Sequence, residues 1–270
     1  CGIFGIVSGK DSQLYGKRAR RAADLLFRLS ESRGKEAAGI ALLNDDCISI
    51  CKSPVSAHLL IREEEYRDIF RSQGQLKANA AAGIAMIGHS RLVTNGAQQL
   101  SANNQPAVAG GMVAVHNGII TNVDELWATN PDLEQNSQLD SEVLLRLLRK
   151  LRERRPDLGN SLRRLYDMIE GVATMAVMFE DLDAILLATN NGSLYAVENE
   201  RDDLVFASEA FILKRFLNDK TMSRIFPGTI HHLEAGTATI INLRTLQRQN
   251  LQLLEPDVTM PLPTTTRRVV

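Results

Sequence analysis

The sequence lacks the features that mark several classes of protein. Only three of its 270 residues are cysteine, an odd number that cannot form a disulfide framework and that suits a reducing compartment. The 31 Lys and Arg residues are balanced by 32 Asp and Glu residues, so no excess of positive charge attracts nucleic acid or an anionic membrane. No apolar run approaches the roughly 20 residues that a membrane-spanning helix needs, and the start of the chain has no signal-peptide pattern. These absences predict a cytoplasmic protein that binds neither nucleic acid nor membrane.

The composition is that of a folded protein with a sizeable core. Hydrophobic residues make up 44% of the chain, and 18 glycines and 8 prolines are too few for a low-complexity or collagen-like sequence. The last stretch differs, because Pro261, Pro263 and three consecutive threonines are typical of an extended tail or linker. We therefore expect one domain over residues 1–250 and a tail or linker over 251–270.

Hydrophobic periodicity predicts about ten strands with helices grouped between them. Helices are expected over 13–29, 140–154, 161–169 and 208–217, and 58–71 is a charged amphipathic segment. The basic stretch 17–21 is interpreted as a solvated helix face rather than a phosphate site. Because helices and strands do not alternate strictly, the pattern favours an α+β fold. Strands are expected over 2–7, 39–43, 47–51, 82–87, 112–116, 172–179, 184–188, 193–197, 204–207, 228–233 and 237–243.

Cys1 opens the sequence where an initiator methionine would stand, and we expect a chain processed to begin at this thiol-bearing residue. An N-terminal cysteine carries its own base, because the α-amine has an ordinary pKa of about 7.7–8.0 against about 8.5 for the thiol. The amine can accept the thiol proton directly or through a water, as in N-terminal threonine nucleophiles. Cys1 is thus a candidate nucleophile, although removal of methionine before a small residue is also routine.

A thiolate that attacks an amide creates an oxyanion, which needs hydrogen-bond donors placed in advance. Asn117 and Gly118 are candidates: if a strand ends at His116, a tight Asn-Gly turn exposes the Asn117 amide and the Gly118 N–H. The alternative is that Asn-Gly only forms a hairpin turn. Arg91 is a candidate carboxylate clamp and Asp140, at the start of a helix, a candidate ammonium acceptor. Each could instead be a surface or capping residue.

Several ordered segments together resemble the class II glutamine amidotransferase domain, an N-terminal-nucleophile hydrolase. They are Cys1-Gly2-Ile3-Phe4-Gly5, the segment Arg33 to Ile40, the loop Gly88 to Gly96, the segment His116 to Asn122, and Asp140-Ser141-Glu142. Asn103-Asn104-Gln105-Pro106 and Phe206-Ala207-Ser208-Glu209 are similar to stretches of the amidophosphoribosyltransferase and glucosamine-phosphate synthase branches. The resemblance departs from the family at Glu36 and Ala37, which replace Asp-Ser, and at Leu92, which replaces a frequent aromatic residue.

The resemblance implies a four-layer αββα sandwich of two antiparallel sheets and a glutaminase that forms glutamate and ammonia through a Cys1 thioester. It assigns Cys1 as nucleophile with Arg33 nearby, Asn117 and Gly118 as oxyanion hole, Arg91 and Thr94 as carboxylate contacts, and Asp140 as ammonium contact. The ammonia would pass to a synthase, which implies either a separate subunit or a fragment of a longer synthase. L-glutamine and a synthase domain or subunit are the expected partners.

Other interpretations remain open. The chain could be an N-terminal-cysteine amidase for another acyl amide, or a non-catalytic regulatory module with the same fold. His89 and His116 could pair with the thiol, but core or turn packing is the favoured interpretation. No metal or cofactor is expected: Cys47 and Cys51 lack a second pair with metal-ligand spacing, and no glycine-rich phosphate loop appears. His231 and His232 would point to opposite faces of a strand, which is a poor geometry for binding one metal ion between them.

Overall fold

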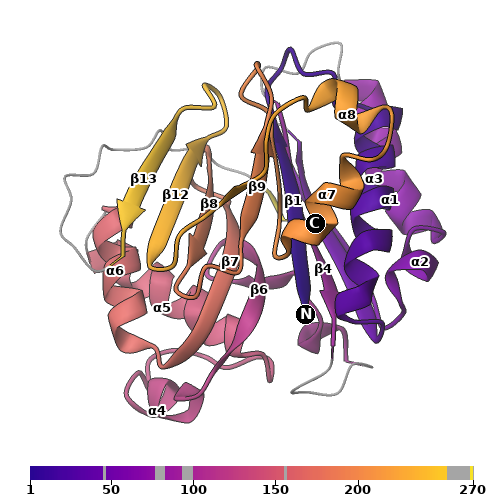
Figure 1. Cartoon of the computed structure of the whole chain (residues 1–270). Helices are drawn as coiled ribbons and strands as arrows, with labels where there is room; N and C mark the ends of the chain where they lie inside the picture. The colour runs from indigo at the N-terminus through magenta and orange to yellow at the C-terminus, as the bar shows by residue number, and fades with distance from the viewer. Residues whose placement is uncertain (45–46, 77–82, 93–99, 155–156, 254–267, 270) are drawn as a thin grey trace.

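Two β-sheets pack face to face in the centre of the molecule, and helices cover the outer face of each sheet (Figure 1). The computed structural model describes residues 1–270 except 45–46, 77–82, 93–99, 155–156, 254–267 and 270. The four layers, helices, sheet, sheet and helices, confirm the predicted αββα sandwich.

One sheet has eight strands and the other has six. Neighbouring strands are antiparallel in both sheets, apart from the parallel pair β14–β3. In spatial order the eight-stranded sheet consists of β11 (His231–His232), β9 (Tyr195–Glu198), β10 (Leu204–Ala207), β1 (Gly2–Ser8), β4 (Ile84–Arg91), β2 (Ala37–Asn44), β3 (Cys47–Ser53) and β14 (Arg268–Val269). The six-stranded sheet consists of β13 (Arg248–Gln252), β12 (Thr237–Asn242), β8 (Ala184–Thr189), β7 (Gly171–Phe179), β6 (Met112–Ile120) and β5 (Ala107–Ala109).

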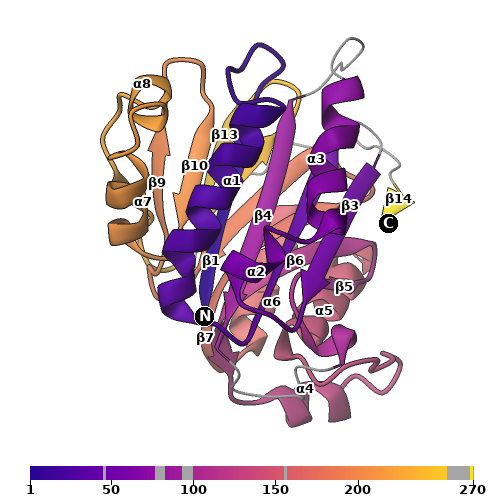
Figure 2. The same cartoon turned by 90° about the vertical axis from the view of Figure 1, so that its right-hand side faces the viewer.

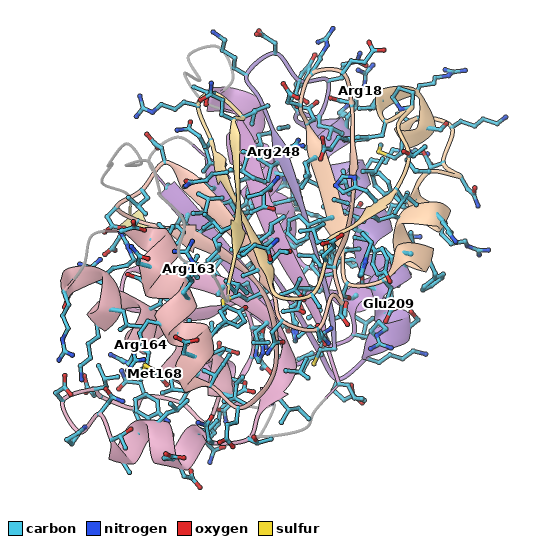
Figure 3. The ribbon with its side chains drawn as sticks, turned by 60° about the vertical axis from the view of Figure 1, so that its left-hand side comes forward. Arg18, Arg163, Arg164, Met168, Glu209 and Arg248 are labelled. Carbon is cyan, nitrogen blue, oxygen red and sulfur yellow. The ribbon has the colours of Figure 1, made fainter. Side chains whose placement is uncertain are left out.

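The helices fall into two groups, one for each sheet (Figure 2). The eight-stranded sheet is covered by α1 (Lys17–Ser30), α2 (Ala57–Leu60), α3 (Glu64–Leu76), α7 (Ala210–Phe216) and α8 (Met222–Ile225). The six-stranded sheet is covered by α5 (Asp140–Arg154) and α6 (Leu158–Met168), and α4 (Val123–Ala128) packs against α5. Arg163 of α6 donates from Nε to the carbonyl of Gln252 on β13 at 3.0 Å, which ties this helix layer to the sheet edge (Figure 3).

The apolar stripe of α5 illustrates why the helices lie where they do. Val143, Leu144, Leu147 and Leu148 recur at spacings of three and four, and all four are buried against the six-stranded sheet. Helix α1 begins at Lys17, four residues later than predicted. The Ser12 hydroxyl donates to Asp203 Oδ2 and accepts the N–H of Leu14. These two hydrogen bonds hold the residues before Lys17 in a loop and explain the later start of the helix.

The core between the sheets decides which strand positions reach the site. Ile3 and Val7 of β1, Ala85 and Ile87 of β4, and Val113 and Val115 of β6 all belong to it. Since successive side chains of a strand point to opposite faces, odd-numbered positions of these three strands face the space between the sheets. Even-numbered positions such as Phe4, Met86 and Met112 face the helices.

Some predicted bounds differ from the structure. The segment 58–71 is divided between α2 and α3, the strand predicted over 228–233 contracts to His231–His232, and β5, β13 and β14 were not predicted. Strand β13 continues to Gln252, whereas 254–267 lie outside the described residues. The division of the chain at residue 250 stays a prediction.

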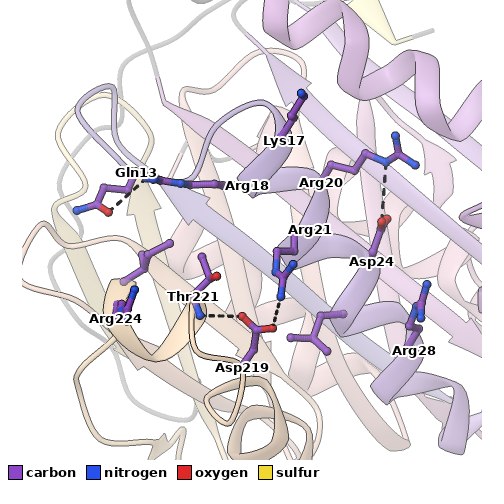
Figure 4. A pocket seen from close by; sticks show the side chains of 12 residues that line it. Gln13, Lys17, Arg18, Arg20, Arg21, Asp24, Arg28, Asp219, Thr221 and Arg224 are labelled. Atoms are coloured by element: carbon purple, nitrogen blue, oxygen red, sulfur yellow. Dashed lines mark hydrogen bonds and ion pairs between the residues drawn. The ribbon is translucent and has the colours of Figure 1, made fainter.

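The predicted basic stretch is exposed on α1, where it lines a groove of about 910 Å³ between α1 and α8 (Figure 4). Part of its charge is neutralised, since Arg21 pairs with Asp219 at 2.6 Å and Arg20 with Asp24 at 3.8 Å. The basic side chains of the groove are Lys17, Arg18, Arg20, Arg21, Arg28 and Arg224. None of the described helices is both long and apolar enough to cross a bilayer.

Candidate active site

Cys1 lies directly before β1, at one end of the sandwich (Figures 1 and 2). Strand β1 runs between β10 and β4, and its start is fixed by two bonds: the Ile3 N–H donates to Ser208 Oγ at 3.2 Å, and the Ser208 N–H donates to the Ile3 carbonyl at 2.9 Å. The half-buried Cys1 thiol donates to the Leu92 carbonyl at 3.5 Å. The thiol is thus held beside the end of β4.

Arg33 lies next to Cys1, as the resemblance implies. Its Nε donates to the Cys1 carbonyl at 3.4 Å, and its Nη1 pairs at 3.4 Å with Glu209. Glu209 directly precedes α7 (Figure 3). The pKa of the Cys1 amine is lowered, mainly by burial and to a smaller extent by the positive charge of Arg33. The negative charges of Glu36 and Glu209 oppose this shift. A lowered pKa increases the fraction of neutral amine near pH 7, the form that can accept a proton.

The predicted Asn-Gly turn is wrong, because Asn117 and Gly118 lie inside β6, paired with Thr174 and Ala173 of β7. The hydrophobic strand does not end at His116: the pairing with β7 continues to Ile120. Asn117 is an odd-numbered position and therefore lies on the face between the sheets, the same face as Ile3 of β1 and Ile87 of β4.

The ladder also fixes the direction of the Gly118 N–H. Antiparallel pairs alternate between hydrogen-bonded and non-hydrogen-bonded. At one end of the β6–β7 ladder the Thr121 N–H donates to the Glu170 carbonyl, and at the other end the Glu180 N–H donates to the Gly111 carbonyl. The odd-numbered positions of β6 therefore form the backbone hydrogen bonds to β7. The N–H of Gly118 therefore points away from β7. On the same side, the N–H of His116 donates to Gln105 Oε1 and that of Ile120 to Asp140 Oδ2.

Only glycine fits at position 118. A Cβ atom there would lie 1.8 Å from the carbonyl oxygen of Val172 on the neighbouring strand. The close approach of β6 and β7 thus explains the glycine without a turn.

Arg91 is the last residue of β4 and is buried with 4% of its surface exposed. Its Nη1 donates to Asn104 Oδ1 at 2.7 Å. Burial lowers the pKa of Arg91, while the negative charges of Asp140 and Glu36 oppose this shift. Thr94, the other predicted carboxylate contact, lies outside the described residues.

Asp140 is the first residue of α5, where the helix dipole favours a negative charge. Its Oδ2 accepts the N–H of Ile120 at 3.2 Å, and its Oδ1 lies 3.5 Å from Nδ1 of His116. Burial acts to raise the pKa of Asp140, but the hydrogen bonds and charge of His116 and two backbone N–H bonds outweigh it, so the pKa is lowered. A cavity of about 390 Å³ lies beside Asp140 and is also lined by Thr121, Gln135 and Gln138.

The two histidines of this region are packed rather than solvated. The His116 ring lies between the Val172 carbonyl, 3.3 Å from Nε2, and the Ser141 hydroxyl, 3.4 Å from Nδ1. His89 is 1% exposed, and within the described part of the chain neither ring nitrogen has a hydrogen-bond partner. Burial lowers its pKa well below the ordinary value, and the charges of the Cys1 amine and Arg91 act in the same direction. His89 is therefore neutral.

The remaining thiols differ from Cys1. Cys51 is buried in β3, and burial raises its pKa to about 12, so this thiol is inert. Cys47 lies on the same strand, 3.7 Å from the Ser49 hydroxyl. In the described ranges, no group of three or more His, Cys, Asp and Glu side chains could hold a metal ion.

Sequence reasoning missed the polar residues that support the site. Glu142 accepts the N–H groups of Asn136 and Ser137 and the Arg146 guanidinium, and so holds the loop before α5. The run Asn103-Asn104-Gln105 was noted only as a resemblance, although all three amides are at most 6% exposed. Three consecutive amides followed by proline were the available signal.

Solved structures share this fold. The glutamine phosphoribosylpyrophosphate amidotransferase of B. subtilis, complexed with ADP and GMP, superposes with a TM-score of 0.65 over 94% of this chain and 49% of that chain, at 20% identity. A structure of the allosteric regulatory enzyme of purine biosynthesis gives a TM-score of 0.67 at 19% identity, with the same coverage. This chain thus shares the fold of these two enzymes.

Sequence comparisons identify the family. Residues 89–215 match the family model described as glutamine amidotransferase domain. The glutamine–fructose-6-phosphate aminotransferase (isomerizing) of Rhizobium meliloti (strain 1021) is 30% identical over 227 residues, which cover 82% of this chain and 33% of that protein. The protein of the same name from Agrobacterium fabrum is 29% identical over 225 residues, with the same coverage. The chain belongs to the class II glutamine amidotransferase family. It spans about a third of the length of these relatives.

Proposed function

We propose that this chain hydrolyses the side-chain amide of L-glutamine to glutamate and ammonia, with Cys1 as the nucleophile, and that the ammonia passes to a synthase. The observation that carries the proposal is the convergence of four groups at one end of the sandwich. These are the Cys1 thiol with an amine of lowered pKa, the Asn117–Gly118 pair of β6, buried Arg91 and ionised Asp140.

In the first half of the reaction, the Cys1 amine takes the thiol proton and the thiolate sulfur attacks the Cδ carbonyl carbon of glutamine. The resulting oxyanion accepts hydrogen bonds from the Asn117 amide and the Gly118 N–H. The tetrahedral intermediate then breaks its C–N bond, and the protonated amine delivers its proton to the leaving nitrogen. Ammonia and a γ-glutamyl thioester are formed.

In the second half, water attacks the thioester and the amine accepts a water proton. The same two donors stabilise the second oxyanion. Collapse of this intermediate breaks the C–S bond, and the proton returns from the amine to the thiolate as glutamate leaves. The cycle consumes one water and requires no metal ion or cofactor.

Two charged residues suit the amino-acid head of glutamine. The planar guanidinium of Arg91 can bind the α-carboxylate in a bidentate manner, and Asp140, whose lowered pKa keeps it ionised, can accept the α-ammonium. The negative charge of Asp140 opposes the lowering of the Arg91 pKa by burial. Thr94 remains a proposed second contact of the carboxylate.

The fate of the ammonia follows from the relatives. Because the chain spans about a third of their length, we propose that a synthase accepts the ammonia, either as a further domain or as a separate subunit. Reconstitution with candidate synthases identifies the acceptor. A cytoplasmic location remains a prediction.

The experiment is an assay of glutamate release from glutamine by wild-type protein and by Cys1→Ser, with Cys47→Ser as the matched control. We expect Cys1→Ser to lose orders of magnitude in turnover, because the hydroxyl is a weaker nucleophile, and Cys47→Ser to match wild type. A form extended by one uncleaved residue before Cys1 should also be inactive. Normal turnover by the extended form would contradict the free-amine mechanism. Preference for another acyl amide would support a different amidase, and no turnover with any amide would support a regulatory module.

A further inference from the structure

The segment Asn103 to Pro106 lies between the two sheets and contacts three elements of the site through consecutive side chains. Asn103 contacts the residues before α5, Asn104 contacts β4, and Gln105 contacts β6. All three amide side chains are buried, with 2%, 1% and 6% of their surface exposed. Buried amides are costly unless they are hydrogen-bonded, so this arrangement needs a physical explanation.

Gln105 binds the backbone of β6 at two points. Its Nε2 donates to the His116 carbonyl at 3.0 Å, and its Oε1 accepts the His116 N–H at 2.5 Å. These two bonds extend the ladder of β6 past the end of β5, at a point where none of the described strands supplies them. They fix the strand one residue before Asn117 and two residues before Gly118.

Asn104 and Asn103 hold the two charged residues. Asn104 Oδ1 accepts Nη1 of Arg91 at 2.7 Å, which fixes the orientation of the guanidinium. Asn103 bonds Gln138 twice: its Oδ1 accepts the Gln138 N–H at 3.0 Å, and its Nδ2 donates to Gln138 Oε1 at 3.1 Å. Gln138 precedes Asp140 by two residues, so this pair fixes the start of α5.

The backbone of the segment is itself held against the eight-stranded sheet. Lys52 of β3 donates from Nζ to the carbonyls of Asn104 at 2.8 Å and Pro106 at 3.0 Å. Gly39 of β2 allows the close approach, because a Cβ atom there would lie 2.2 Å from the Gln105 carbonyl oxygen. The segment is therefore anchored on the eight-stranded sheet, while Gln105 reaches β6 of the other sheet and Asn103 reaches the residues before α5.

We propose that Asn103, Asn104 and Gln105 are positioning residues that set the distances between the carboxylate clamp, the oxyanion donors and the ammonium acceptor. The proposal rests on the proposed glutaminase function. Each side chain bonds a different element of the site, so we expect each to govern a different part of the reaction. Asn104 acts on substrate binding through Arg91, Gln105 acts on the oxyanion through β6, and Asn103 acts on substrate binding through Asp140.

The test measures KM and kcat for glutamine in single variants of the three residues and asks whether neighbouring substitutions affect different constants. We expect Asn104→Ala to raise KM for glutamine about tenfold or more with kcat within about threefold, because a hydrogen bond to a charged group orients the clamp. We expect Gln105→Ala to lower kcat about 10- to 100-fold with a small change in KM, because only the intermediate depends fully on the oxyanion donors. Asn103→Ala should resemble Asn104→Ala.

The matched control is Asn199→Ala. Asn199 accepts the N–H groups of Arg201 and Asp203 in the turn before β10, at the end of β1 opposite to Cys1. It should lower thermal stability without changing KM or kcat per folded molecule. If the three segment variants, like Asn199→Ala, only lost thermal stability, with no separation of KM from kcat, the segment would only stabilise the fold and the proposal would be overturned.

Hydrogen exchange provides a readout that does not depend on activity. Gln105→Ala should accelerate exchange in peptides of β6, and Asn103→Ala in peptides around the start of α5, while Asn199→Ala changes neither. If the wild-type protein releases no glutamate, the proposed function fails, but this exchange pattern still tests the positioning role. Unchanged exchange in both segments would overturn the positioning role even in an active enzyme.

Discussion

Replacement of Asn117 by aspartate tests whether this residue stabilises the oxyanion or only belongs to β6. The two side chains have nearly the same shape, and Asn117 is half-buried on a strand that pairs through its backbone with Thr174. A purely structural position should therefore accept Asn117→Asp with little loss of stability. An oxyanion donor should not, because the change removes the N–H group and introduces a negative charge.

The expected magnitude follows from two effects that act in the same direction. Loss of one oxyanion donor typically lowers kcat by about 10²–10³, or about 2.7–4 kcal/mol of transition-state stabilisation. Repulsion between the new carboxylate and the oxyanion adds to this, since two like charges about 4 Å apart at an effective dielectric constant of about 20 interact by about 4 kcal/mol. We expect a fall in kcat of at least about 10³ at pH 8. Binding of glutamine should change less, because its carbonyl carries less charge than the intermediate.

The assay is glutamate release under saturating glutamine, together with thermal melting. Asn250→Asp is the matched control, because Asn250 lies on β13 at the edge of the same sheet, and its Oδ1, which aspartate retains, accepts the Thr239 hydroxyl. Both variants should melt near the wild-type temperature. Turnover by Asn117→Asp within about threefold of wild type would refute the oxyanion assignment.

Three further predictions concern charge and packing. Arg33→Gln removes a positive charge, so it should raise the pKa of the Cys1 amine and move the acidic side of the kcat/KM pH profile to higher pH, whereas Arg33→Lys should leave the profile unchanged. An unchanged profile in Arg33→Gln would argue against the amine as the base. Asp140→Asn keeps an acceptor for the Ile120 N–H but loses the charge, so KM for glutamine should rise about tenfold or more, and an unchanged KM would remove Asp140 from the substrate site. The Phe179 ring is fully buried, and Cζ of Arg152 lies 5.1 Å from its centroid. Phe179→Ala should therefore lower the free energy of unfolding, measured by chemical denaturation, by about 3–5 kcal/mol with KM unchanged. A loss below about 1 kcal/mol would contradict the packing.

The elements with strong local signals were predictable from the sequence. Helix α5 begins and ends where the apolar stripe, Asp140 at its start and Pro156 after its end indicate. Strand β10 also has its predicted bounds, because a short apolar run is bounded by polar residues. In both cases the residues that decide the structure lie within the element.

The extent of β6 could not be predicted in this way. Asn-Gly is a frequent hairpin turn, and this local preference predicted that the strand ends at His116. Pairing with β7, more than fifty residues later in the sequence, continues the strand to Ile120, and the Val172 carbonyl determines the need for glycine at 118. The supporting amides were missed for the same reason: the partner of Asn103 is Gln138, 35 residues away.

The location of the site follows from the register of the sheets rather than from any one motif. Gly2 pairs with Ser90, which sets the start of the chain beside the end of β4, and β4 contacts β6 across the space between the sheets. Because strand side chains alternate, a slip of one residue in β4 would turn His89 and Arg91 from the space between the sheets toward the helices, and a slip in β1 would do the same to Cys1. Each polar residue taken alone fits a cap, a turn or a buried core position. The register brings the thiol, Arg91 and β6 to one end of the sandwich, so the argument for a catalytic site depends on tertiary pairing that no single segment encodes.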